Sequence, residues 1–276
     1  KLALELDPER AEWHHNIAVL YLRAQQTEAA KQHFTQALKL QPDNTIAQHM
    51  LAALQVTPAT NAPPKEYVTS LFEQYAGYYN KHVTDTLQYK APQLLRNAIS
   101  KFITPLTLQK SILDLGCGTG LCGIYFRDLA RFLVGMDLSI SMLSQAKSLG
   151  AYDGLCCGDI LEAIPGINQN CFELIIAADV FVYIGELDNI FKNIKSALQN
   201  NGQLAFTIET QDDNNSFMLQ ATGRYAHSDN YIQYLAVKHN LSIETNTTVE
   251  PRVQNGIPVP GRLYVMRNLT NAAPLD

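Results

Sequence analysis

The sequence contains few cysteines, no long apolar run and no cluster of cationic side chains. Its five cysteines include no Cys-x-x-Cys pair and no histidine partners at zinc-site spacing, which predicts reduced thiols, no metal and a cytoplasmic location. The longest apolar stretch, roughly residues 174–184, contains Asp179 and is shorter than the ~20 residues that a membrane helix needs. The first residues carry no signal-peptide pattern. These absences predict a soluble protein with no membrane partner.

The charge balance is mildly acidic. The chain has 26 Asp and Glu against 21 Lys and Arg, a formal net charge of −5. Affinity for phosphate backbones depends on clustered cations, so we expect no general nucleic-acid binding, while a local basic patch for RNA stays open. Hydrophobic residues make up 46% of the 276 residues, which predicts a folded chain, and the length favours two domains.

The first part of the chain contains an internal repeat. Residues 3–8 (Ala-Leu-Glu-Leu-Asp-Pro) return as residues 37–42 (Ala-Leu-Lys-Leu-Gln-Pro), an offset of 34 residues, with apolar residues at helical spacing between them. This pattern resembles the tetratricopeptide repeat, although Trp13 stands one position before the usual aromatic residue. We predict a small all-α segment of such repeats over residues 1–56, followed by a proline-rich linker over residues 57–65.

The two ends of this segment lead to further expectations. Residues 1–6 read as the closing helix of an earlier repeat, and residues 44–54 as the first helix of a later one. Because such repeats bury their faces only against neighbours, we expect more repeats upstream of Lys1. The segment is expected to bind a peptide or protein partner, or alternatively to be a stabilising or dimerising appendage.

From residue 111 onward, strand patterns alternate with helix patterns. This alternation indicates a doubly wound, Rossmann-like α/β sheet of seven strands, with the last two forming an antiparallel hairpin at one edge. Ser141 is expected to cap the second helix, and residues 200–202 to form a turn. The predicted strands cover roughly residues 111–114, 132–137, 154–157, 172–177, 203–209, 241–249 and 263–267. The predicted helices cover roughly residues 119–130, 141–149, 187–199 and 228–240.

Gly116, Gly118 and Gly120 lie between the first of these strands and the helix after it. Glycines there let the backbone approach a ligand, and the helix start supplies free N–H donors for a phosphate or carboxylate. The spacing fits neither the dinucleotide fingerprint nor the P-loop. Asp137 ends the second strand and Asp159 follows the third, so all three features meet at the carboxyl ends of the strands. They predict a ligand with a carboxylate, a ribose and an adenine but no phosphate, which is S-adenosylmethionine.

Residues 111–209 resemble a class I S-adenosylmethionine-dependent methyltransferase. The resemblance depends on the run Asp114-Leu115-Gly116-Cys117-Gly118-Thr119-Gly120, on Asp137 and on Asp159-Ile160. It implies that the glycine loop lines the methionine moiety, that Asp137 holds the ribose, and that Asp159 and Ile160 bind the adenine edge. Leu138 and Met142 would pack on the adenosine, with Met142 equally compatible with ordinary helix packing. The implied cofactor residues of this domain are Asp114, Gly116, Cys117, Gly118, Gly120, Asp137, Leu138, Met142, Asp159, Ile160 and Ala178.

Residues 72–80 (Phe-Glu-Gln-Tyr-Ala-Gly-Tyr-Tyr-Asn) resemble the helix that covers the cofactor in many such enzymes. The resemblance implies that Tyr75 and Tyr79 lie near the sulfonium, and the family often has Asp in place of Asn80. The predicted methyltransferase domain therefore spans residues 66–276, with a helical lid over 66–110 and a sheet core over 111–276. Its tail, including Gly223-Arg224-Tyr225-Ala226-His227-Ser228, resembles that of bacterial repeat-containing methyltransferases, whose family label names no substrate.

Methyl transfer needs a base only where the acceptor must lose a proton. The candidates are Asp179, Tyr183, Glu209 and His227; His227 has the most suitable intrinsic pKa, or is alternatively a helix cap or loop contact. Residues 179–182 replace the Asn/Asp-Pro-Pro-Tyr motif of amino-group methyltransferases, which disfavours amine acceptors. We expect methylation of an unidentified small molecule at oxygen or carbon, with S-adenosylhomocysteine as product. The alternatives are a protein methyltransferase that recruits its substrate through the repeats, and a non-catalytic S-adenosylmethionine-binding scaffold.

Overall fold

The computed structural model describes most of the chain, namely residues 7–57, 60–80, 83, 86–104, 110–166, 169–211, 215–254 and 256–269. The predicted closing helix over residues 1–6 and the end of the chain beyond residue 269 lie outside these ranges. Within them, no helix has both the length and the apolar character needed to cross a membrane.

The N-terminal region is helical. It consists of α2 (Ala11–Arg23), α3 (Thr27–Leu40) and α4 (Thr45–Ala53). Asn44 caps α4, because its Oδ1 accepts a hydrogen bond from the backbone N–H of Ala47 at 2.9 Å. The helices enclose a small apolar core in which alanines allow close approach, formed by the fully buried Ala18, Ala30, Phe34 and Ala37.

A mostly parallel sheet forms the centre of the larger domain, with the strand order β3-β2-β1-β4-β5-β11-β8. The strands of this path are β1 (Lys110–Leu115), β2 (Ala130–Asp137), β3 (Gly154–Cys157), β4 (Phe172–Ala177), β5 (Leu198–Thr210), β8 (Leu241–Val249) and β11 (Gly261–Asn268). Strands β1 to β5 pair in parallel, and β11 is antiparallel to both β5 and β8. The seven-strand path agrees with the predicted Rossmann-like sheet.

Additional short strands extend the predicted sheet. Over the described residues the sheet has nine strands, because β6 (Phe217–Leu219) and β7 (Tyr225–His227) join it beside the end of β5. A separate hairpin of β9 (Val253–Gln254) and β10 (Ile257–Pro258) lies between β8 and β11 in the sequence. These short strands were not predicted, since two or three residues give no measurable periodicity.

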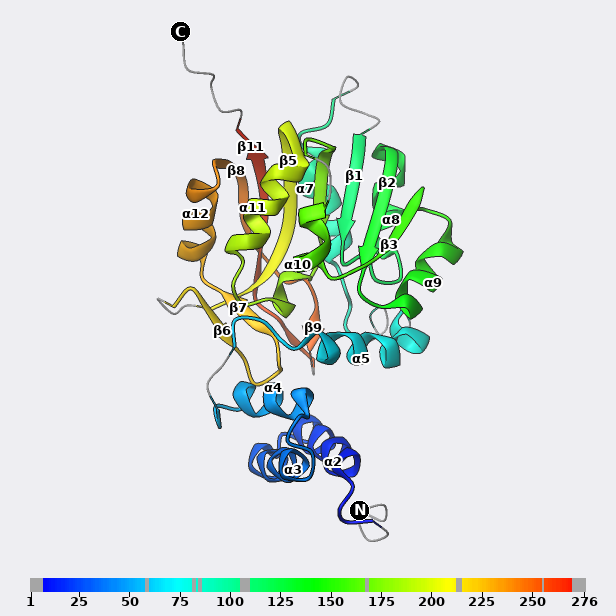
Figure 1. Cartoon of the computed structure of the whole chain (residues 1–276). Helices are drawn as coiled ribbons and strands as arrows, with labels where there is room; N and C mark the ends of the chain where they lie inside the picture. Colours follow the sequence, from blue (N-terminus) through cyan, green and yellow to red (C-terminus); the bar gives the residue numbers. More distant parts are fainter. Residues whose placement is uncertain are drawn as a thin grey trace.

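Both faces of the sheet are covered by helices, because alternate strand residues point to opposite sides. Leu113 and Ile175 share a core with α11 (Asp188–Ala197) and α12 (Asp229–Lys238). Their neighbours Ile112 and Ile176 share the opposite core with α7 (Ala91–Ser100) and α8 (Leu121–Phe126). Figure 1 shows α7 and α11 on opposite sides of the central strands. The remaining helices are α5 (Lys65–Tyr75), η1 (Ala76–Tyr78), η3 (Arg127–Leu129), α9 (Ile140–Leu149), α10 (Ile160–Ala163), η4 (Ile164–Gly166) and η5 (Phe181–Tyr183).

Some predicted element boundaries are wrong. Ser139, not Ser141, caps α9, since the Ser139 Oγ accepts the N–H of Met142 at 3.1 Å. Helix α8 begins later than predicted because Gly120 adopts a left-handed conformation, with φ of 93°, immediately before it. Residues 200–202 lie inside β5 rather than between elements, where the pairing of β5 with β4 shifts in register.

The N-terminal region is docked on the larger domain through the predicted linker. The carbonyl of Asn61 accepts hydrogen bonds from the N–H groups of Gly185 and Glu186, each at 2.9 Å. The hydroxyl of Tyr225 donates to the carbonyl of Thr60 at 2.8 Å. Figure 1 shows α4 below the β6–β7 hairpin and α5 across the lower end of the sheet. Residues 60–63 are therefore a packed connection, not a free tether.

Phe34→Ala should destabilise the N-terminal region by roughly 3–5 kcal/mol, because it leaves a cavity in a small core. The matched change Leu20→Ala, at a side chain that is 59% exposed, should alter stability by less than about 0.5 kcal/mol. Trp13, the single tryptophan, lies on α2 and reports urea unfolding of this region by fluorescence. Equal effects of the two substitutions would contradict the buried position of Phe34.

Candidate functional site

The glycine loop after β1 is shaped by backbone conformations that favour glycine. Gly116 and Gly118 have φ values of 62° and 54°. A Cβ on Gly116 would lie 2.7 Å from a methyl group of Val180, whereas one on Gly118 would meet nothing within 4 Å. The loop is thus packed from one side at Gly116 and open at Gly118, which suits the approach of a ligand to its backbone.

Asp137, at the end of β2, is fixed against this loop. Its Oδ2 accepts the N–H of Gly118 at 2.8 Å, and its Oδ1 accepts the N–H of Ser139 at 2.9 Å. Burial raises the pKa of Asp137, although these backbone hydrogen bonds act in the opposite direction. A carboxylate oxygen has two lone pairs, so the side chain can also accept ligand hydroxyl groups.

The predicted covering helix is held over the carboxyl ends of the strands by polar contacts. Glu73 on α5 accepts hydrogen bonds from Ser139 Oγ at 2.7 Å and from both the backbone N–H and the hydroxyl of Ser141. These bonds lower the pKa of Glu73, with that from the Ser141 side chain contributing most. The Oδ1 of Asn80 accepts a 2.5 Å hydrogen bond from Thr119 in the glycine loop. Asn80 therefore joins the covering segment to the glycine loop. At position 80 the family that this sequence resembles often has Asp.

A cavity of about 1080 Å³, including its open mouth, lies between this covering segment and the sheet. The rings of Tyr75 and Tyr79 pack edge to face with centroids 4.8 Å apart, and both residues line the cavity. Burial raises the pKa of Tyr79 well above its ordinary value. The predicted site residues that line the cavity are Tyr75, Tyr79, Gly116, Gly118, Asp137, Leu138, Asp159, Ile160, Ala178, Asp179 and Tyr183.

The other predicted cofactor residues lie outside the described lining of the cavity. Asp114 is buried on β1 and accepts a 2.6 Å hydrogen bond from the hydroxyl of Tyr152. Gly120 packs against Ala146 on α9. The side chain of Met142 is fully buried, which matches its helix-packing alternative. The predicted cofactor residues in these positions are Asp114, Cys117, Gly120 and Met142.

His227 does not occupy the position of a catalytic base. It is fully buried, and its Nε2 bonds to the carbonyl of Gly185 at 3.0 Å, so this nitrogen is the donor. Burial lowers the pKa of His227 to about 4. It is also outside the described lining of the cavity, and its ring stacks on that of Tyr231 on α12, so its location fits packing rather than proton transfer.

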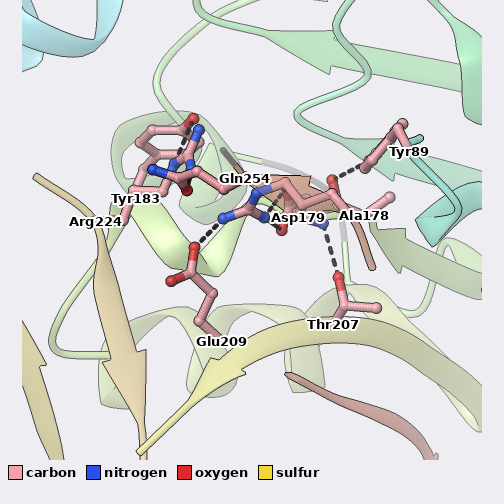
Figure 2. Close-up of polar contacts among 9 residues, drawn as sticks. Tyr89, Ala178, Asp179, Tyr183, Thr207, Glu209, Arg224 and Gln254 are labelled. Carbon is pink, nitrogen blue, oxygen red and sulfur yellow. Dashed lines mark hydrogen bonds and ion pairs between the residues drawn. The ribbon is translucent and has the colours of Figure 1, made fainter. Parts of the chain in front are cut away.

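Asp179 is held by a buried arginine. Arg252 bonds to both carboxylate oxygens of Asp179 and to Glu209 on β5. Figure 2 labels the two acids, Asp179 and Glu209, among these polar contacts. The backbone of Asp179 has φ of 60°, an uncommon conformation for a residue with a side chain. Its N–H donates to the hydroxyl of Thr207 at 2.9 Å. Burial raises the pKa of Glu209, and the charge of Arg252 opposes this. Both base candidates are thus committed to the same guanidinium group.

A second arginine in the cavity has different partners. Arg224 donates to the Oε1 of Gln254 at 3.0 Å and to the hydroxyl of Tyr183 at 3.4 Å (Figure 2). The charges of nearby groups, including Asp179, raise its pKa against the effect of burial. Within the described residues no carboxylate forms an ion pair with Arg224. Neither arginine was predicted as a site residue; only the tail motif at residues 223–228 gave a signal for Arg224.

The described side chains fit S-adenosylmethionine. Asp137 offers acceptors for ribose hydroxyls, the open backbone at Gly118 offers space, and Tyr75 and Tyr79 form an aromatic wall against which a cation is stabilised. Asp159 caps α10 by accepting the N–H of Leu161 at 2.8 Å and still faces the cavity. No group of three or more potential metal ligands is present among the described side chains.

The fold and this donor set define a doubly wound enzyme that binds a nucleoside at the carboxyl ends of its strands. A family model described as a methyltransferase domain matches residues 106–249, more than half of the chain. The chain belongs to this methyltransferase family. It is an enzyme, and its cofactor is S-adenosylmethionine.

The chain is similar to several known proteins. It is 26% identical over 181 residues to the malonyl-[acyl-carrier protein] O-methyltransferase of Salmonella typhimurium, covering 64% of this chain and 68% of that protein. The chain spans 53% of the length of the malonyl-[acyl-carrier protein] O-methyltransferase of Pseudescherichia vulneris. The fold matches that of an S-adenosylmethionine-dependent methyltransferase from Mesorhizobium loti, with a TM-score of 0.51 and 18% identity. This match covers 62% of the present chain and 96% of the other. It also matches that of the [4+2]-cyclase SpnF, with a TM-score of 0.62 and 16% identity. Here the match covers 77% of the present chain and 98% of SpnF.

Asp137→Ala should weaken S-adenosylmethionine binding roughly 10- to 100-fold, because the change removes charge-assisted hydrogen bonds to the ribose. Isothermal calorimetry measures the dissociation constant directly. Asp128→Ala, at a surface aspartate paired with Arg96, is the matched control and should leave it unchanged. Equal affinities of the Asp137 variant and the parent would contradict the assigned role.

Asp114→Asn should change how stability depends on pH. Burial raises the pKa of Asp114 from 3.8 to about 7, so the folded state holds this proton more tightly than the unfolded state does. The stabilisation is complete below about pH 4 and is lost as the pH rises through about 7. The parent should lose up to a few kcal/mol relative to the variant over this range, at about 1.4 kcal/mol per pKa unit. Urea unfolding followed by circular dichroism measures the difference; parallel pH curves would refute it.

Proposed function

We propose that the chain transfers the methyl group of S-adenosylmethionine to an oxygen of an anionic acceptor, most simply an ionised carboxylate. The observation that carries this proposal is the unequal pairing of the two arginines. Arg252 bonds to both nearby carboxylates, whereas Arg224 has only neutral hydrogen-bond partners within the described chain. A guanidinium group in such surroundings is suited to bidentate binding of a carboxylate.

The state of the other ionisable groups supports an acceptor that needs no deprotonation. The carboxylates of the described lining are all engaged, Asp137 and Asp159 by backbone N–H groups and Asp179 by Arg252. His227 is bonded to Gly185 and is not part of the described lining of the cavity. A carboxylate is already ionised at neutral pH, so its oxygen can attack without a general base.

The residues that line the cavity would favour methyl transfer in further ways. When bound, S-adenosylmethionine supplies an activated methyl group on a positively charged sulfur. Tyr75, Tyr79 and Phe72 form an aromatic wall that excludes water from the reacting groups. Arg224 would hold the acceptor in one orientation, and correct orientation by itself provides a large share of such rate accelerations. An anionic oxygen and a sulfonium lose their opposite charges on reaction, which a cavity of low polarity favours.

The names of the relatives agree with this proposal. Several are malonyl-[acyl-carrier protein] O-methyltransferases, names that state transfer to oxygen of a carboxylate-bearing acyl group. We therefore take a small acidic acyl group, free or attached to a carrier, as the first acceptor to test. The fold alone does not decide the reaction, since a [4+2]-cyclase has a similar one.

The proposal also takes α2 and α3 as a tetratricopeptide repeat. The 34-residue offset in the sequence and the buried alanines between the two helices, Ala18, Ala30 and Ala37, support it. The docking of α4 on the larger domain favours an appendage over a recruiting arm for a protein substrate. The cytoplasmic location stays a prediction.

Arg224→Gln should raise the KM for malonyl-acyl carrier protein roughly 10- to 100-fold, because it removes a charge-assisted contact to the acceptor. The affinity for S-adenosylmethionine, measured by calorimetry, should change less than about twofold. Arg131→Gln is the matched control, since this arginine is 64% exposed and pairs with Glu173 outside the cavity. A screen of methyl acceptors that finds turnover of neutral compounds only would defeat the proposal.

A further inference from the structure

Arg224 lies in the turn between β6 and β7, which is closed by its own backbone. The N–H of Gly223 donates to the carbonyl of Gln220 at 2.9 Å, and the N–H of Gln220 donates to the carbonyl of Arg224 at 2.8 Å. Gly223 has φ of 78°, which a residue with a Cβ rarely adopts. The direction of the Arg224 side chain therefore depends on how this turn is held.

The N-terminal region holds the turn on both sides of Arg224. His49 on α4 bonds through Nε2 to the carbonyl of Gly223 at 2.9 Å, in a buried position. A carbonyl only accepts, so Nε2 carries the proton and His49 is the donor. On the other side, Tyr225 donates its hydroxyl to the carbonyl of Thr60 at 2.8 Å. The residues directly before and after Arg224 are thus both bonded to the segment that precedes α5.

Close packing leaves little room for the turn to move. A Cβ on Gly223 would lie 2.7 Å from the hydroxyl of Tyr67 and 3.2 Å from the sulfur of Met50. The ring of His49 packs on that of Tyr67 with centroids 4.6 Å apart. Tyr225 is fully buried in a cluster with residues of α4. Apolar contact and one buried hydrogen bond together connect α4 with the turn.

We infer that His49 is a positioning residue for Arg224, so that the N-terminal helical region completes the acceptor half of the active site. The inference deepens the proposed function and rests on it for the role of Arg224. Because Arg224 has no ion-pair partner in the described residues, its orientation depends on the turn and on the neutral groups of Tyr183 and Gln254. Deleting the N-terminal region would remove this support whether or not the region also recruits a substrate.

The experiment compares three single variants. His49→Phe keeps an aromatic ring but removes the donor, and His49→Gln places an amide N–H where it can restore the bond. His15→Phe is the matched control, since His15 lies on α2 and packs on Phe34 inside the same helical region. The first readout is backbone hydrogen exchange of residues 217–227 with S-adenosylhomocysteine bound, which requires no methyl acceptor.

Exchange in the turn should be at least about fivefold faster in His49→Phe and near the parent rate in His49→Gln and His15→Phe. The second readout is the KM for malonyl-acyl carrier protein, which His49→Phe should raise about two- to tenfold with kcat nearly unchanged. In an Arg224→Gln background the same change should have no further effect on KM, because His49 acts through Arg224.

Unchanged exchange in His49→Phe, or an additive effect on KM in the double variant, would overturn the inference. If the parent does not methylate malonyl-acyl carrier protein, the proposed acceptor class fails in that assay. The exchange experiment still decides whether His49 holds the turn, so the two failures are distinguishable.

Discussion

Parallel pairing of the first five strands is the constraint on which the site depends. It aligns the carboxyl ends of β3, β2, β1 and β4 at one edge of the sheet, so residues that follow different strands meet there. Asp137, the last residue of β2, lies beside the loop after β1, and the N–H of Gly118 in this loop donates to its carboxylate. The apolar helices on both faces maintain this alignment, because neither face of the sheet could remain in water.

The second half of the site is governed by buried charge. Arg252, almost entirely buried, connects Asp179 at the end of β4 to Glu209 near the end of β5. Removing charges from water is costly, and a buried arginine is tolerated because carboxylates accept hydrogen bonds from its N–H groups and balance its charge. This pairing occupies the two acids that could otherwise act as bases, and it leaves Arg224 as the cation without a paired acid in the described cavity. The ion pairs thus distinguish Arg252, which has a structural role, from Arg224, which is suited to binding a ligand.

Much of the fold was predictable because its signals are local. The strands at residues 154–157, 172–177 and 241–249 agree with their predicted limits, since each is a contiguous apolar or alternating run. The cap of α9 was misassigned because Ser139 and Ser141 are chemically alike, and only the hydrogen bond from the N–H of Met142 to the Oγ of Ser139 distinguishes them. The short strands β6 and β7 gave no signal, although they carry the turn that contains Arg224.

The sequence by itself determined the parallel architecture, the glycine loop and the class of cofactor, because strand periodicity, glycine spacing and acids at strand ends are written in neighbouring residues. Tertiary structure alone decided which ionisable groups face the cavity: it buried His227, paired Asp179 with Arg252 and brought Arg224 into the lining. It also brought His49 to Gly223, a partner 174 positions away. Such contacts leave no local pattern, because they depend on how helices and strands from distant parts of the chain pack together.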